Sequence, residues 1–272
     1  MADSRLVKAK NFIQTDMGVA ELYACARGTT ALYTHRAPHK DTPNEDTVAL
    51  IPVSNRNGVM VVADGVGGSP TGQDASRIAI ESITDSINKA ISDNASLRDG
   101  ILNGIEAANK RICESSTGSA TTLAVLEIQD RTIRSYHVGD VLILVTGQRG
   151  KLKHQNVPHS PVGYAVESGM LDETEAVHHE ERNIVSNVIG ATDMRIEIGP
   201  TIELAQHDTL IISSDGLPDN LYINEIVEHI RKGPLKTVSA RLIQQCHSRM
   251  DHLEENQPHH PDDLSFILYR PG

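Results

Sequence analysis

The sequence predicts an α+β protein in which clusters of strands are interrupted by two pairs of helices. Apolar runs of strand length come in groups, and two regions place apolar residues at every third or fourth position. Single strands and single helices do not alternate strictly, which argues against a βαβ fold. A chain of 272 residues buries a sizeable core without disulfides. Because no repeat or linker interrupts it, we predict one domain over residues 1–272.

The individual elements follow from the hydrophobic pattern in chain order. Strands are expected first, at 18–26, 47–53 and 58–63. Helices are expected next, because apolar residues recur at helical spacing over 73–92 and 97–112. More strands should follow, at 121–128, 132–138, 141–146, 151–155, 194–198, 200–204 and 208–214. The chain then closes with helices and a strand, near 222–231, 235–249 and 264–269.

Charge and composition exclude several classes of partner. Lys plus Arg is 25 and Asp plus Glu is 36, so the formal charge is −11, and no basic run offsets it. Nucleic acid and anionic membrane are therefore disfavoured. No apolar stretch approaches the ~18 residues that span a bilayer, and residues 1–10 lack the apolar segment of a secretion signal. Cys25, Cys113 and Cys246 are too far apart for a disulfide framework, which predicts a cytoplasmic protein.

Aspartates stand at the ends of five predicted strands: Asp46, Asp64, Asp140, Asp215 and Asp262. Burial disfavours the charged form of a carboxylate, and converging carboxylates repel one another unless a cation compensates them. A divalent metal ion resolves both problems, and oxygen donors favour Mg²⁺ or Mn²⁺ over zinc. Asp-Gly pairs are also common turns after strands. Five carboxylates at five strand ends nevertheless favour the metal interpretation.

Six motifs resemble the metal-dependent protein Ser/Thr phosphatases of the 2C class in their bacterial form. They are NED (44–46), VVADGVGGSPTGQDAS (61–76), GSATT (118–122), HVGD (137–140), SSDGLPD (213–219) and DDLSFIL (262–268). The resemblance covers the chain from about residue 44 to its end. It implies a four-layer αββα sandwich of two antiparallel sheets flanked by helix pairs. It also implies hydrolysis of phosphoserine and phosphothreonine, dependent on Mn²⁺ or Mg²⁺.

The resemblance implies a role for each matching residue. Asp64 is expected to bridge two metal ions, with the backbone carbonyl of Gly65 binding one of them. Asp215 and Asp262 would complete the other ion, and Asp46 would hold metal-bound water. Asp46, Asp64 and Asp215 are thus the expected catalytic residues, with a metal-activated water as nucleophile.

Two further aspartates also occupy positions of the family's motifs. Asp140 occupies the position of the family's GD motif and would join Asp215 at a weaker third metal. Asp263 takes the place of an Asn that is common in relatives. Asp262 is therefore the expected ligand.

Two family positions differ in this chain. Asp41 stands where many relatives carry an Arg that grips the substrate phosphate. Lys40 or Arg36 is expected to bind the phosphate instead, and a Lys would do so as a point charge without the fork of an Arg. Val66 replaces a His proposed to protonate the leaving alcohol in eukaryotic relatives. A metal-bound water is the expected proton source, with His39 as the alternative.

Residues 157–192 have mixed polarity and little periodicity, as functional or disordered loops of this length do. They resemble the mobile flap beside the active site of bacterial members of the class, with a short helix at 172–176. We expect this flap-like insertion to influence substrate choice. His259 and His260 come just before Asp262 and could tune the site by protonation.

The expected partners are phosphorylated proteins, opposed by a Ser/Thr kinase. Two other functions stay open at this point. One is a phosphoprotein-binding module of the same fold without turnover, which Asp41 and Val66 favour and the intact carboxylate set opposes. The other is a hydrolase of small phosphoesters, which relative activity on phosphopeptides and phosphometabolites would distinguish.

Overall fold

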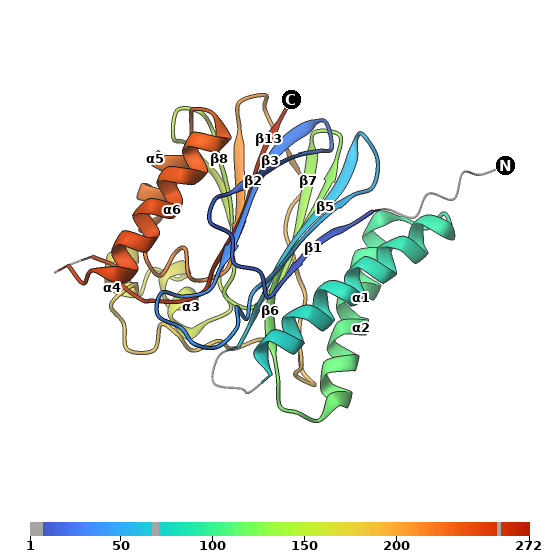
Figure 1. Ribbon diagram of the computed structural model, residues 1–272, viewed down its shortest axis with the longest axis horizontal. Helices are drawn as coiled ribbons and strands as arrows, with labels where there is room; N and C mark the ends of the chain where they lie inside the picture. The colour runs from blue at the N-terminus through green and yellow to red at the C-terminus, as the bar shows by residue number, and fades with distance from the viewer. Residues whose placement is uncertain (1–7, 67–70, 255–256) are drawn as a thin grey trace.

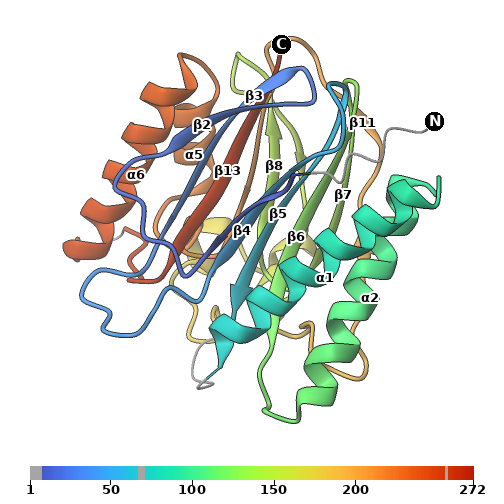
Figure 2. The same ribbon diagram turned by 45° about the vertical axis from the view of Figure 1, so that its right-hand side comes forward.

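The computed structural model describes residues 8–66, 71–254 and 257–272, and they form four layers (Figure 1). Residues 67–70 of the second motif and residues 1–7 lie outside this description. Two β-sheets form the inner layers, and helices cover their outer faces (Figures 1 and 2). The helices are α1 (Gly72–Ser92) and α2 (Leu97–Ser115) on one side and α5 (Ile223–Ile230) and α6 (Leu235–Asp251) on the other. The predicted αββα sandwich is confirmed.

The first sheet is antiparallel throughout its described strands. It contains β1 (Lys10–Ile13), β4 (Thr47–Pro52), β5 (Asn57–Gly65), β6 (Thr121–Gln129), β7 (Thr132–Val138), β10 (Glu197–Ile198) and β11 (Ile202–Glu203). The strand order is β1-β4-β5-β6-β7-β10, and β11 also pairs with β7. Helices α1 and α2 lie across this sheet (Figure 2).

The second sheet is also antiparallel. It contains β2 (Glu21–Cys25), β3 (Gly28–His35), β8 (Leu142–Thr146), β9 (Leu152–Gln155), β12 (Thr209–Ser213) and β13 (Leu264–Pro271). The strand order is β2-β3-β13-β12-β8-β9, so β13, the last strand of the chain, lies in the middle of the sheet.

Alternation along the strands explains the layering. In β4, Val48 and Leu50 belong to the core between the two sheets, whereas Ala49 and Ile51 belong to the core beneath α1 and α2. Successive side chains of a strand point to opposite faces, so one strand contributes to both cores. Because both faces are buried, strands such as β4 and β5 read as nearly continuous apolar runs without polar alternation.

The structure contains elements that the sequence pattern did not predict. Strand β3 lies between β2 and β13, but its hydrophobic pattern is interrupted by Thr30 and Thr34, which are fully buried. Their hydroxyl groups are satisfied by hydrogen bonds, to the carbonyl of Tyr23 and with Asn44 and Ser265 respectively. Strand β1 and helix α3 (Pro161–Glu167) were also not predicted, and the strands expected at 194–198 and 200–204 are only two residues long.

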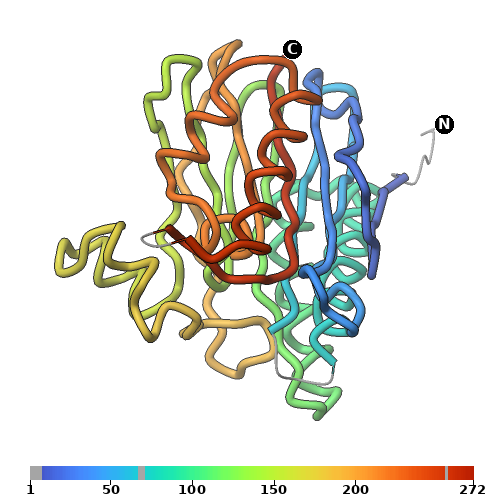
Figure 3. The backbone as a smooth tube through the Cα atoms, turned by 60° about the vertical axis from the view of Figure 1, so that its left-hand side comes forward, coloured from blue at the N-terminus to red at the C-terminus, as the bar shows by residue number. Residues whose placement is uncertain are grey.

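The segment 157–192 projects from one side of the sandwich (Figure 3). Its first helix, α3, begins after Ser160, whose hydroxyl accepts a hydrogen bond from the backbone N–H of Gly163. Its second, α4 (Glu173–Ala176), begins with a capping box formed by Asp172 and Glu175, and confirms the short helix expected at 172–176. In the described parts of the chain, no helix is long and apolar enough to cross a membrane.

Candidate metal centre

The strand register brings the predicted aspartates to one edge of the sandwich. Asp46 directly precedes β4 and Asp64 lies near the end of β5, and their neighbours Thr47 and Ala63 are paired. In the second sheet, Asp215 follows β12 and Asp262 precedes β13, strands that run antiparallel side by side. Antiparallel neighbours place the end of one strand beside the start of the next. The chain therefore folds with these carboxylates at the same end of both sheets.

The negative charges of the other four predicted aspartates act on Asp64, as expected for carboxylates gathered at one edge. Burial raises the pKa of Asp64 well above its ordinary value, and the negative charges of the other four raise it further: Asp215, Asp46, Asp262 and Asp140. The pKa of Asp215 is raised in the same way, by burial first and then by charges that include Asp262 and Asp140. Burial raises the pKa of Asp140 to about 7. Without a cation, this cluster favours protonated carboxyl groups.

Asp46 is the most deeply placed member of the cluster. Its side chain is fully buried, and its Oδ2 accepts a hydrogen bond from the Ser214 hydroxyl at 2.9 Å. Its Oδ1 is buried and has no hydrogen-bond partner among the described residues. Burial, with the charge of Asp263, raises the pKa of Asp46 to about 7. A buried carboxylate oxygen left free in this way is suited to a metal ion or its water.

Two of the glycines beside the aspartates allow backbone segments to approach closely. A Cβ atom on Gly65 would lie 2.3 Å from the carbonyl oxygen of Gly72, the first residue of α1. A Cβ atom on Gly216 would lie 2.1 Å from the carbonyl oxygen of Asp263. Neither space admits a side chain. Gly216 thus lets the loop that carries Asp215 pack against the segment that carries Asp262.

The neighbouring aspartates Asp262 and Asp263 make different hydrogen bonds. Both oxygens of Asp263 are occupied: Oδ1 accepts from the N–H of Ala37, and Oδ2 accepts from the N–H of Glu45 and from Lys40 Nζ, each at 2.7 Å. Asp262 is half-exposed, and within the described parts of the chain its Oδ1 accepts only from the adjacent N–H of Asp263. This arrangement supports Asp262 as the metal ligand.

The two candidate phosphate-binding residues are both paired with carboxylates. Lys40 Nζ lies 2.7 Å from carboxylate oxygens of Asp263 and Glu45, and its side chain is 18% exposed. Burial lowers the pKa of Lys40, but these two partners outweigh it and raise the pKa above its ordinary value. Arg36 Nε lies 3.2 Å from Asp16. The pairing of Lys40 indicates a structural role, and the phosphate role of both residues stays a prediction.

Replacing Lys40 with methionine is expected to destabilise the protein by about 3 kcal/mol, because it leaves two carboxylates near the core unpaired. For a chain of this size, that loss lowers the melting temperature by roughly 6–12 °C. Lys40→Arg keeps the charge and should recover most of the stability. A Lys40→Met variant with unchanged melting temperature and a raised KM would instead assign Lys40 to the substrate.

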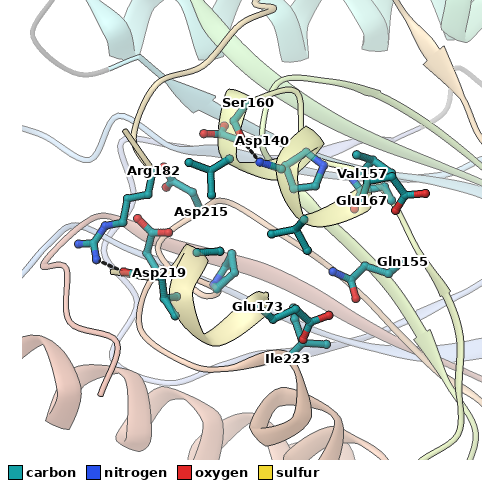
Figure 4. A pocket seen from close by; sticks show the side chains of 18 of the residues that line it. Asp140, Gln155, Val157, Ser160, Glu167, Glu173, Arg182, Asp215, Asp219 and Ile223 are labelled. Carbon is teal, nitrogen blue, oxygen red and sulfur yellow. Dashed lines mark hydrogen bonds between the residues drawn. The ribbon is translucent and has the colours of Figure 1, made fainter. Parts of the chain in front are cut away.

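Asp219 and Arg182 belong to this neighbourhood but were not predicted as site residues. The pKa of Asp219 is raised to about 6 by burial, and the nearby charges of His260 and Arg182 oppose that rise. Figure 4 shows Arg182 and Asp219 beside Asp215. Asp219 is the last residue of the SSDGLPD motif, so this motif could have indicated Asp219 as a site residue. Arg182 lies in the segment 157–192, which has little hydrophobic periodicity. No sequence pattern therefore indicated that Arg182 belongs to this site.

The histidines near the cluster take different positions. His260 Nε2 lies 3.5 Å from Asp262 Oδ2, and that hydrogen bond raises the pKa of His260. His260 is therefore placed to respond to the charge of Asp262. His39, the alternative proton donor, is 93% exposed on its side chain and lies 3.9 Å from Asp251. The described structure thus places His39 in solvent.

A second set of possible ligands, His137, His159 and Glu197, lies farther along the same edge. Among the described residues, this set brings three ligand atoms within 4.8 Å of one another, closer than any three aspartates. His159 Nδ1 accepts hydrogen bonds from the N–H of Gly139 and from Asn187 Nδ2, so its proton is on Nε2, which donates to Glu197. Since a protonated nitrogen cannot bind a metal, His159 serves instead to hold the Gly139 turn.

Replacing His159 with alanine should cost about 1–3 kcal/mol, because the buried N–H of Gly139 loses its acceptor. Thermal unfolding in the presence of a chelator measures this loss. His178→Ala, an exposed histidine of the same segment, is the matched control and should change little. If a chelator lowered the stability of His159→Ala much less than that of the unchanged protein, His159 would be a metal ligand after all.

The donor set of the aspartate cluster fits a hard divalent ion. All predicted ligands are oxygen atoms, and one buried carboxylate oxygen has no partner among the described residues. Mg²⁺ and similar ions keep several waters and use one or two carboxylates each, so a cluster wider than the histidine set suits them. An αββα sandwich with buried carboxylates at one edge is the arrangement expected of a metal-dependent hydrolase of phosphoesters.

Comparison with known proteins identifies the family. Residues 34–264 match the protein phosphatase 2C family, and the chain belongs to it. Protein phosphatase PhpP of Streptococcus pneumoniae serotype 2 is 33% identical over 199 residues, which cover 69% of this chain and 78% of PhpP. The protein is thus a metal-dependent protein Ser/Thr phosphatase, as the motifs predicted.

Solved structures agree on the fold. The serine/threonine phosphatase of S. agalactiae superposes with a TM-score of 0.73 at 25% identity, over 89% of this chain and 99% of that one. The catalytic domain of the phosphatase PstP, solved in complex with two manganese ions, superposes with a TM-score of 0.67 at 19% identity, over 89% and 96% of the two chains. The αββα architecture is therefore shared.

Proposed function

We propose that the aspartate cluster is the centre at which this phosphatase hydrolyses phosphoserine and phosphothreonine in proteins. The convergence of all five predicted aspartates, each from a different part of the chain, carries the proposal. The six groups that would hold metal are Asp46, Asp64, Gly65, Asp140, Asp215 and Asp262. The charges of the other four predicted aspartates all act on Asp64, which suits a residue that would contact more than one ion.

The ions are Mn²⁺ or Mg²⁺, two in number, with a weaker third near Asp140 and Asp215. The PstP structure with its two manganese ions supports this number. When bound, such ions activate a water and neutralise charge that develops on the phosphoryl oxygens. The chain itself orients the carboxylates: Ser214 fixes Asp46, and Gly216 holds the Asp215 loop against the segment of Asp262.

Asp46 contributes by positioning. Its Oδ2 is held by Ser214, and its Oδ1 faces the buried site without a partner among the described residues. Such an oxygen can accept a hydrogen bond from an attacking water and fix its direction. The leaving alcohol requires a proton, and the solvent-exposed position of His39 favours water as its source.

The substrates are phosphorylated proteins in the cytoplasm, and a Ser/Thr kinase would supply them. The unpaired cysteines, Cys25, Cys113 and Cys246, fit a reducing compartment. The catalytic unit comprises residues 1–272 as one domain, with 157–192 as a flap beside the site. Exchanging the flap for a short Gly/Ser linker should change the order in which phosphopeptides are preferred.

Phosphate release from a phosphothreonine peptide tests the proposal most directly. Metal-stripped protein should be inactive, and added Mn²⁺ or Mg²⁺ should restore turnover. Binding of the phosphopeptide without release would favour a phosphoprotein-binding module. A much higher kcat/KM on small phosphoesters than on phosphopeptides would favour a hydrolase of small molecules.

A further inference from the structure

A cavity of about 380 Å³ opens beside the aspartate cluster and extends beneath the flap. Asp140, Asp215 and Asp219 line it at the metal end (Figure 4). The lining also includes Gln155 and Glu167, on the right of Figure 4, and Glu173, at its lower centre. The volume falls in the range of pockets that bind small groups specifically. The cavity therefore joins the proposed reaction centre to further polar residues, of which the flap contributes Glu167 and Glu173.

The walls between these two ends are apolar. Val162 and Val166 of α3, Val177 after α4, and Leu221 just before α5 line the cavity. Such walls suit an extended hydrocarbon chain, because they exclude water from its methylene groups. They leave an apolar passage between two acidic ends.

The charges at the two ends are not equivalent. Arg182, a cation of the lining, donates hydrogen bonds to the carbonyls of Val177 and His259 and acts on Asp219 at the metal end. Glu167 and Glu173 are exposed and form no ion pair among the described residues. The far end thus carries negative charge that the described part of the chain does not compensate.

We propose that this cavity receives a lysine or arginine side chain of the phosphoprotein substrate, close in sequence to the phosphorylated residue. The inference rests on the proposed function. The methylene stem lies along Val162, Val166 and Val177, and the cationic head meets Glu167 and Glu173. A purely apolar side chain would desolvate the two carboxylates without a partner, and an acidic one would be repelled. The geometry therefore selects a long basic side chain.

Phosphothreonine peptides of otherwise neutral sequence test the proposal. Lysine, norleucine or glutamate is placed in turn at each of the four positions on either side of the phosphothreonine. Norleucine retains the hydrocarbon stem of lysine and lacks its charge. With Mn²⁺ and low salt, lysine should exceed norleucine in kcat/KM by about five- to tenfold at one or two positions, as expected for two carboxylates at a partly exposed site. The preference should weaken as salt is raised.

Substitutions in the cavity lining test whether the lysine preference arises in this cavity. In the double variant Glu167→Gln/Glu173→Gln, the lysine preference should fall to about onefold, because the lysine peptide loses its two partners and the norleucine peptide no longer desolvates two carboxylates. Glu180→Gln removes the same charge from an exposed flap position outside this cavity and should keep the preference. Charge reversal in Glu167→Lys should favour the glutamate peptide. Melting temperatures confirm that each variant is folded.

The outcomes separate this inference from the function on which it rests. Equal rates on lysine and norleucine peptides at every position, or a lysine preference that survives in the double variant, would overturn the inference and leave the phosphatase function intact. Failure of the unchanged protein to release phosphate from any peptide would overturn both.

Discussion

Replacing Asp64 with asparagine is expected to abolish phosphate release while making the metal-free protein more stable. Activity should fall by at least about 10³-fold, because loss of metal charge stabilisation removes several kcal/mol at the transition state. Stability should rise, because the Asp64 carboxylate is buried among like charges that raise its pKa. Asparagine keeps the shape of the side chain and removes the repulsion. Phosphate release with Mn²⁺ and thermal unfolding with a chelator measure the two effects.

The opposite signs of the two effects make this result specific. A residue needed for folding would lose activity and stability together, whereas a metal ligand in a repulsive cluster loses only activity. Asp215→Asn should behave in the same way, since the pKa of Asp215 is raised by the same causes. Asp85→Asn, on the exposed surface of α1, is the matched control and should change neither quantity. Turnover near that of the unchanged protein in Asp64→Asn would contradict the assignment of the centre.

The sequence was sufficient for elements whose burial follows a simple pattern. Strands β4 and β5 are buried on both faces and read as uninterrupted apolar runs, and α1 places Ile83 and Ile87 on one face. Strand β3 could not be recognised in this way. Its buried threonines are satisfied by partners such as Asn44 and Ser265, which become neighbours only in the folded chain.

Site residues, too, could be predicted where a local sequence pattern marks them and not where they depend on contacts of the folded chain. The aspartates were found because each lies at the end of a hydrophobic strand, and antiparallel register then brings those ends together. The pairing of Lys40 with Asp263 and Glu45 could not be predicted, because positions 40 and 263 are remote in sequence. Their contact depends on the central place of β13 beside β3. The position of Arg182 could not be predicted either, because hydrophobic periodicity does not determine the path of the segment 157–192.

The melting temperature of the metal-free protein is expected to fall as pH rises through neutrality. The pKa values of Asp46 and Asp140 are raised from an ordinary 3.8 to about 7, and that of Asp219 to about 6. The folded protein therefore holds protons that the unfolded chain has released between about pH 4 and 7. This stabilisation is fully present below pH 3.8 and is lost as pH rises through the folded pKa values. His137 acts in the other direction, because burial lowers its pKa to about 4 and its contribution is lost as pH falls.

Metal ions should reverse the loss caused by the carboxylates, since they take the place of the protons. At a concentration one hundred times the Kd, an ion stabilises the folded state by about 2.7 kcal/mol, which corresponds to roughly 5–10 °C here. Because protons compete with the metal, the difference in melting temperature with and without Mn²⁺ should grow from pH 5 to pH 8. The contribution of His137 cancels in that difference, since it is present in both measurements. A difference that stayed constant or shrank with rising pH would mean that the aspartates do not hold the ions.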